Sequence, residues 1–209
     1  MLNKNYYGDL IGGSLMITES RIIAELLLKK FTEGEWKKLI YEDNILQKKS
    51  INTASRNAHT LRKRLEPMSD EFLKSLLEVS ERAYIQLLMV SFLINSPVVS
   101  DFMRQSLAEA RRTYKTILSS HAWSEFIDDR IRAFPELNKY SSATIKKMGN
   151  NAVKALVDSG YLNSSLRRQI QPVYLLSEVR SCLKELGRED LIKYRKYKSH
   201  IFILQAVKY

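Results

Sequence analysis

Apolar residues recur at intervals of three and four positions along most of this 209-residue chain. That spacing places them on one face of an α-helix, so it predicts amphipathic helices rather than strands. Seven glycines and four prolines are few for this length, so positions that break helices are sparse. Helices are predicted at residues 18–30, 35–47, 50–66, 69–79, 81–95 and 98–116, with Thr18 and Ser50 as N-caps. The pattern indicates a mainly α-helical protein.

The helix expected to follow Ser50 has an apolar face and a polar face. The apolar face consists of Ile51, Ala54, Ala58, Leu61 and Leu65, and the opposite face carries Asn52, Arg56, His59 and Lys63. The helix before it would bury Trp36, Leu39, Ile40 and Leu46. Two helices joined by a short polar connection are typical of a helix-turn-helix, in which the second helix carries side chains to a DNA groove.

The stretch from Lys48 to Arg64 is basic and contains no acidic residue. Its cations are Lys48, Lys49, Arg56, Arg62, Lys63 and Arg64. The whole chain has 34 lysines and arginines against 23 aspartates and glutamates, a net charge of +11. That charge favours an anionic partner, either nucleic acid or an acidic membrane surface. For this stretch taken alone, the alternative is a basic helix face that contacts only water.

The second half of the chain predicts a further pair of helices followed by a basic loop. A helix from Trp123 to Ala133 is closed by Pro135, and a second helix begins after Ser141 and ends at Gly160 as a left-handed C-cap. The second helix should bury Ile145, Met148, Ala152 and Leu156 and direct Thr144, Lys147, Asn150, Asn151, Lys154 and Asp158 outward. A loop with Arg167 and Arg168 and an edge strand at residues 169–176 should follow. This order is typical of a winged helix, with an unrelated helical domain as the alternative.

The end of the chain combines bases with aromatic residues. Ser177 is expected to cap a helix that runs to Leu186 and stops at Gly187. In the tail, Lys193, Arg195 and Lys196 alternate with tyrosines, a combination that contacts phosphates and stacks on bases, or else forms a solvated face before a final strand. We expect a helical domain at residues 1–118 and a winged-helix-like domain at residues 119–209.

Catalytic and metal-binding motifs are not found in the sequence. The histidines at positions 59, 121 and 200 are far apart, and Cys182 is the only cysteine, so we expect no metal and no cofactor. Gly12-Gly13 lacks the context of a phosphate-binding loop. The most apolar window, from Ala83 to Ile94, is shorter than the ~20 residues that span a bilayer, and no signal peptide is apparent. We expect a cytoplasmic protein with neither membrane insertion nor a small-molecule substrate.

A set of scattered positions resembles a known family. These positions are Tyr6-Tyr7, Gly12-Gly13-Ser14-Leu15-Met16, Glu19-Ser20-Arg21, Trp36, Asn44-Ile45-Leu46-Gln47-Lys48, Thr53-Ala54-Ser55-Arg56, Arg64-Leu65, Asp101-Phe102 and Gly160-Tyr161-Leu162. They are similar to the BrxA proteins of BREX bacteriophage-exclusion systems, over nearly the whole chain. The resemblance implies a bacterial, cytoplasmic, mainly helical protein without enzymatic activity. It also implies DNA binding in a phage defence that includes a methyltransferase, an ATPase and a phosphatase-like protein.

Charge, pattern and resemblance favour a protein that binds double-stranded DNA with low sequence specificity, because phosphate-directed lysines and arginines outnumber base-reading amides. The candidate contact residues are Lys48, Lys49, Asn52, Arg56, His59, Arg62, Lys63, Arg64, Thr144, Lys146, Lys147, Asn150, Asn151, Lys154, Arg167, Arg168, Lys193, Arg195 and Lys196. The alternatives are a helical adaptor that docks acidic proteins of the defence complex and a helical RNA-binding protein.

Overall fold

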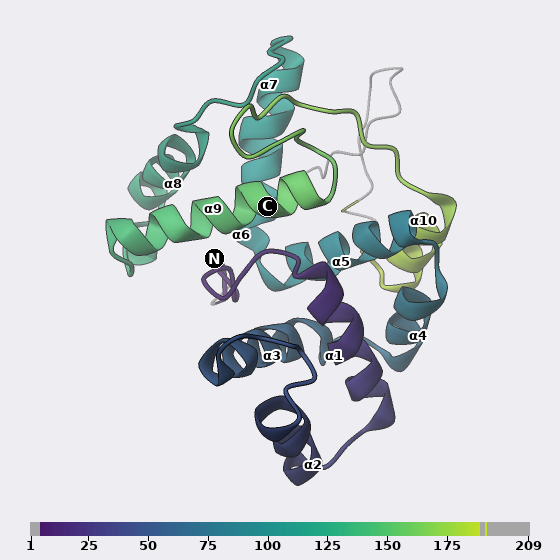
Figure 1. Ribbon diagram of the computed structural model, residues 1–209. Helices are drawn as coiled ribbons and strands as arrows, with labels where there is room; N and C mark the ends of the chain where they lie inside the picture. Colours follow the sequence, from purple (N-terminus) through teal and green to yellow (C-terminus); the bar gives the residue numbers. More distant parts are fainter. Residues whose placement is uncertain (1–4, 189–190, 192–209) are drawn as a thin grey trace.

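The computed structural model describes residues 5–188 and residue 191, and it confirms the all-α class (Figure 1). The first part contains α1 (Ile17–Lys29), α2 (Glu33–Lys37), the π-helical turn η1 (Lys38–Glu42), α3 (Ile51–Leu65), α4 (Asp70–Glu78) and α5 (Glu81–Asn95). Next come α6 (Pro97–Phe102), the π-helical turn η2 (Met103–Leu107), α7 (Ala108–Arg112), α8 (Ala122–Ala133), the 3₁₀ turn η3 (Pro135–Leu137), α9 (Ser142–Asp158) and α10 (Ser177–Glu185).

Three helices begin at a serine whose side chain caps the first turn. The hydroxyls of Ser69, Ser80 and Ser141 accept hydrogen bonds from backbone amides in the first turns of α4, α5 and α9. Each satisfies an amide that has no partner inside its helix. The predicted cap Thr18 is wrong, because α1 begins at Ile17 after Met16, which has a φ of 50°. Ser50 does precede α3 in an extended conformation, but its side chain makes no capping bond.

Two predicted helices end earlier than expected. The helix expected at residues 35–47 stops at Glu42, where η1 changes the hydrogen-bond spacing, and Asn44 and Gln47 then adopt positive φ angles. The connection to α3 therefore covers residues 43–50, longer than the turn of a compact helix-turn-helix. The helix expected at residues 98–116 ends at Arg112.

The strand expected at residues 169–176 is wrong. In the described part of the chain, β-pairing consists of isolated antiparallel bridges between Ile117 and Gln169 and between Leu162 and Ile170. Farther along the segment, the side chain of Gln86 takes the place of a neighbouring strand. Its amide group donates to the carbonyl oxygen of Tyr174 at 2.8 Å and accepts from the amide of Leu176 at 3.1 Å. These bonds satisfy an extended backbone without any sheet.

The N-terminal segment, residues 5–15, lies between α3 and α9 (Figure 1). From α3, Arg64 donates to the carbonyl oxygen of Ser14 at 2.7 Å. From α9, Asn151 donates to the carbonyl oxygen of Leu10 at 2.8 Å. Gly12 also abuts Thr60 of α3 so closely that a Cβ at position 12 would lie 2.2 Å from its hydroxyl oxygen. The segment therefore joins two helices that are far apart in sequence.

A polar cluster joins the same segment to α6 and α8. The Tyr6 hydroxyl donates to a carboxylate oxygen of Asp101 at 2.9 Å, and Arg130 Nε donates to the Tyr6 hydroxyl at 3.0 Å. Arg130 and Arg104 both pair with Asp101. Burial is the main influence on Tyr6 and raises the pKa of its phenol, so the hydroxyl remains a donor at neutral pH.

The expected division of the chain into two domains, at residues 1–118 and 119–209, stays a prediction.

The end of the described chain contains α10. Its N-cap residue is Leu176 rather than the predicted Ser177, and the helix ends at Glu185, before Gly187 with a φ of 64°. The tail residues Lys193, Arg195 and Lys196 and the predicted final strand lie outside the described residues.

Within the described ranges, no single helix is long and apolar enough to cross a membrane. The helices Glu81–Asn95 and Pro97–Ala110 meet that criterion only as a pair, which is bent by 106°.

Candidate nucleic-acid interface

The basic face of α3 is exposed as predicted. Asn52, Arg56, His59 and Lys63 are all exposed, and none of them makes a side-chain hydrogen bond or ion pair with another described residue. The opposite face packs into the core through Ala54, Ala58, Leu61 and Leu65, while Ile51 is 51 % exposed at the start of the helix. The four polar side chains are therefore held on a rigid helix and available to a partner.

Some cations near this face are paired with carboxylates, two of which come from other helices. Lys48 pairs with Glu19 of α1, and Arg62 pairs with Glu33 of α2 at 2.6 Å and with Glu66 at 3.1 Å. The hydrogen bond to Glu33 is the main influence on Arg62 and raises the pKa of its guanidinium. A phosphate would have to compete with these carboxylates. Lys49 is exposed and makes no side-chain contact of this kind within the described chain.

Arg64 is the clearest correction to the predicted contact set. The residue is buried, with 2 % of its surface exposed, and its side chain pairs with Asp9 at 3.0 Å and lies over the Phe92 ring at 4.7 Å. Burial is the larger influence and lowers the pKa of its guanidinium, while Asp9 acts in the opposite direction. A guanidinium enclosed in this way cannot reach a DNA phosphate, so Arg64 is a core residue that attaches the N-terminal segment to α3.

The second predicted helix, α9, presents a narrower polar face than expected. Lys146, Lys147, Asn150 and Lys154 are exposed, and Lys154 pairs with Asp158 at 3.1 Å. Thr144 is half-buried, and its backbone amide donates to the Ser141 cap. Asn151 was predicted to point outward, but it faces the N-terminal segment. Three residues at consecutive helical turns, Lys146, Asn150 and Lys154, thus remain on one accessible line.

The basic loop, residues 163–169, is closed at its base. The backbone amide of Asn163 donates to the carbonyl oxygen of Gln169 at 3.0 Å. The backbone amide of Leu118, before α8, donates to the carbonyl oxygen of Arg168 at 3.0 Å. Arg167 is exposed, whereas Arg168 has a φ of 52° and a side chain that is engaged with the protein. Its Nη1 donates to the carbonyl oxygens of Ser119 and Ser120 at 3.2 and 3.0 Å. Arg168 therefore attaches the loop to the start of α8.

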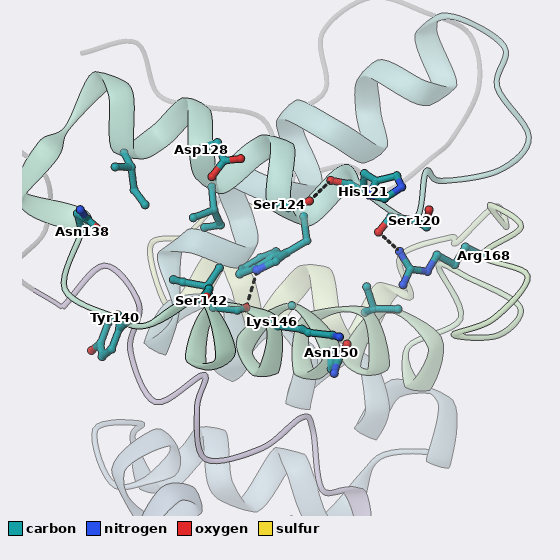
Figure 2. Close-up of a pocket in the computed structure, with 16 residues that line it drawn as sticks. Ser120, His121, Ser124, Asp128, Asn138, Tyr140, Ser142, Lys146, Asn150 and Arg168 are labelled. Atoms are coloured by element: carbon teal, nitrogen blue, oxygen red, sulfur yellow. Dashed lines mark hydrogen bonds between the residues drawn. The ribbon is translucent and has the colours of Figure 1, made fainter.

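A cavity of about 590 Å³ opens between α8 and α9 (Figure 2). It brings together three of the predicted contact residues, Lys146 and Asn150 from α9 and Arg168 from the basic loop. Figure 2 shows Arg168 and His121 at one end of the cavity and Asn138 and Tyr140 at the other. His121 and Tyr140 are lining residues that the sequence did not reveal, because their positions showed no motif or periodicity that signals a site.

Two features limit the chemistry of this surface. Among the described residues, no three histidine, cysteine, aspartate or glutamate side chains gather as a metal site. The Cys182 thiol is buried, and burial raises its pKa to about 11, which keeps it protonated and unreactive at neutral pH. The accessible side chains that line the cavity include amides, hydroxyls and cations, together with the Asp128 carboxylate and the His121 imidazole.

Comparisons with known proteins agree over most of the chain. The model of the BrxA family matches residues 4–187. The BREX protein BrxA of Escherichia coli O9:H4 (strain HS) is 45% identical over 190 residues, which cover 91% of this chain and 89% of that protein. The BREX protein BrxA of Paramagnetospirillum magneticum is 30% identical over 193 residues, which cover 92% of this chain and 97% of that protein.

The fold agrees as well. A crystal structure of an uncharacterized protein from Magnetospirillum magneticum superposes with a TM-score of 0.80 at 28% sequence identity, covering 88% of this chain and 95% of that one. A mainly helical protein with an exposed basic helix and no metal cluster in its described part is thus similar in sequence to BREX proteins and in fold to that crystal structure. The chain belongs to the BrxA family.

Proposed function

We propose that this protein is a non-enzymatic component of a BREX phage-defence system that binds double-stranded DNA with low sequence specificity. The observation that carries the proposal is the exposed face of α3, where Arg56 and Lys63 have no carboxylate partner in the described chain. The net charge of +11 has the sign that a polyphosphate partner requires. The defence role is supported by the relatives that are named BREX protein BrxA.

The backbone pairing around the basic loop, interpreted as that of a winged helix, supports the same proposal. In a winged helix, a short strand precedes the helix pair, and the recognition helix leads into a loop whose two edges pair with each other and with that first strand. Here the bridge between Ile117 and Gln169 pairs the chain before α8 with the far edge of the basic loop. The bridge between Leu162 and Ile170 pairs the two edges of that loop. On this interpretation α9 is the recognition helix, and Arg167 lies in the wing.

Low specificity follows from the kinds of side chain that remain accessible. Lysine and arginine contact phosphates in any sequence, while asparagine can read adenine edges. Asn52 and Asn150 are the exposed amides on the two helices, and they are outnumbered by cations. The other BREX proteins are proposed partners, and the proposal includes a cytoplasmic location, because bacterial DNA lies there.

A second candidate function is an adaptor that docks an acidic partner protein. It is favoured by Tyr114 and Leu166, which are 92% and 91% exposed, in two chain segments that hydrogen bonds hold side by side. Large apolar side chains that stay exposed on adjacent loops are a common feature of protein contacts. DNA binding is preferred because the unpaired cations lie on helices, whereas these apolar residues lie on loops.

Salt-dependent binding tests the proposal directly. We expect Arg56→Ala combined with Lys63→Ala to lower the slope of log affinity against log salt by about two units, because each lost phosphate contact removes roughly 0.9. The matched control is Lys74→Ala combined with Lys184→Ala, which removes the same charge from exposed positions on α4 and α10. An equal slope change in both variants would mean that net charge alone acts and that α3 is not the interface.

A further inference from the structure

The cavity between α8 and α9 has an apolar floor and one basic end. Its floor includes Trp123, Ile127, Ile145 and Val153. Its volume, about 590 Å³, lies within the roughly 300–1,000 Å³ of sites that enclose small ligands. A bare ion would not require this apolar area, and a purely apolar ligand would not require the cations beside it.

The floor is rigid before any ligand binds. Trp123 Nε1 donates to the carbonyl oxygen of Ile145 at 2.9 Å, which fixes the indole against α9. The ring also packs edge-on against Phe102, with 5.1 Å between ring centres. Gly149 lies so close to the indole that a Cβ there would be 2.4 Å from Trp123 Cδ1. An aromatic wall held by these contacts costs little ordering entropy when a flat ligand binds.

The basic end carries groups that have capacity for a ligand. Lys146 and Asn150 are exposed and make no side-chain hydrogen bond or ion pair with another residue of the described chain. Arg168 is held by the carbonyl oxygens of Ser119 and Ser120, so its guanidinium is fixed in position. Figure 2 shows the bond to Ser120. In Figure 2, Asp128 lies away from Arg168, toward the end that Asn138 marks. Positive charge is thus concentrated at one end of an apolar floor.

We propose that this cavity binds one unpaired nucleotide of DNA. The base lies against Trp123 and the aliphatic side chains, and its phosphate contacts Lys146 and Arg168. A base within a duplex cannot enter, because both of its faces are stacked; an unpaired base at a strand end, a bulge or a damaged site has a free face and an attached phosphate. The inference deepens the proposed function, on which it rests, by assigning α9 a preference among DNA structures.

Direct titration with a mononucleotide tests the cavity without duplex DNA. The chain has two tryptophans, so Trp36→Phe leaves Trp123 as the reporter. We expect deoxyadenosine 5′-monophosphate to change the Trp123 fluorescence with saturation, and deoxyadenosine or inorganic phosphate to bind more weakly. Lys146→Ala should weaken binding about ten-fold, the effect of losing one charge-assisted hydrogen bond. Lys147→Ala, the matched control, removes the same charge from the next residue, which does not line the cavity.

Binding to two DNA molecules of equal length and charge tests the preference. One is fully paired, and the other carries a single unpaired nucleotide in the middle. We expect several-fold tighter binding to the second. Ser124→Phe, which fills the cavity from an exposed position on α8, should abolish this difference and leave affinity for the paired duplex unchanged. Circular dichroism of each free variant checks that the fold is intact.

The outcomes separate this inference from the proposed function. One outcome is that the Arg56→Ala/Lys63→Ala variant loses duplex binding while the unchanged protein binds both DNA molecules with equal affinity. That outcome would support the proposed function and overturn the cavity assignment. Mononucleotide binding without any duplex binding would support the cavity and overturn the duplex function. If polyglutamate changes Trp123 fluorescence at lower concentration than deoxyadenosine 5′-monophosphate, the cavity docks an acidic peptide and the nucleotide assignment is wrong.

Discussion

The side-chain amide of Asn151 in α9 donates a hydrogen bond to the backbone carbonyl oxygen of Leu10, 2.8 Å away, and a longer one of 3.4 Å to that of Ile11. One residue earlier in the same helix, Asn150 is exposed and lines the cavity. Two adjacent asparagines therefore have different roles. Asn151 attaches the N-terminal segment to α9, and Asn150 is available to a ligand.

We expect Asn151→Ala to destabilise the protein by about 1–3 kcal/mol, because carbonyl oxygens in a partly buried segment lose their donor. Asn150→Ala should change the free energy of unfolding by less than about 0.5 kcal/mol, as exposed substitutions usually do. Urea denaturation of both variants measures the difference. Equal effects would show that the N-terminal segment does not depend on this attachment.

Arg64→Ala should destabilise the protein strongly. It leaves Asp9 without its cation, in a position where the Arg64 side chain is 1% exposed and that of Asp9 is 9% exposed. Removing one partner of a buried pair costs about 3–5 kcal/mol, whereas replacing both with apolar residues of similar volume costs less. Arg64→Met combined with Asp9→Leu should therefore be more stable than Arg64→Ala alone. Thermal denaturation compares them, and a small loss in Arg64→Ala would contradict the buried pair.

Gly149 and Gly34 offer a matched pair of glycine-to-alanine changes. Gly149→Ala places a methyl group against Trp123, so it should destabilise the protein by about 1–3 kcal/mol and shift the indole fluorescence. A Cβ at Gly34 in α2 would lie 4.0 Å from its nearest neighbour, the Thr32 hydroxyl oxygen, so Gly34→Ala should be neutral or stabilise by up to about 1 kcal/mol. Thermal denaturation of the two variants measures the contrast. If both variants are destabilised, the loss in Gly149→Ala cannot be assigned to the contact with Trp123.

The neighbouring arginines of the basic loop should separate stability from binding. Arg168→Ala removes hydrogen bonds to the backbone of Ser119 and Ser120, so we expect a loss of about 1–2 kcal/mol in unfolding free energy. Arg167 is exposed, so Arg167→Ala should keep the stability and weaken duplex binding. Urea denaturation and a duplex-binding titration of both variants measure the two effects. Unchanged duplex affinity in Arg167→Ala would remove the wing from the interface.

The helices of this protein were largely predictable from sequence. The boundaries of α4, α5 and α9 follow capping serines and apolar spacing, which are local interactions within a few residues. The exposed face of α3 was predictable for the same reason, since periodicity relates each side chain to the helix axis. Boundaries were missed where the local signal was overridden, as at η1, where a π-helical turn ends the helix before residues with positive φ angles.

Periodicity assigns a side chain a direction but does not say whether another part of the chain covers that direction. Asn151 was predicted to point outward and Arg64 to contact DNA, yet both are covered by residues 5–15, which come from elsewhere in the sequence. The cavity has the same origin, because Lys146 and Arg168 meet only where α9 and the basic loop pack beside α8. The sequence alone determined the helices and their faces through local hydrogen bonds and apolar spacing. The tertiary structure decided which polar residues are buried and which converge, because those outcomes depend on contacts between distant segments.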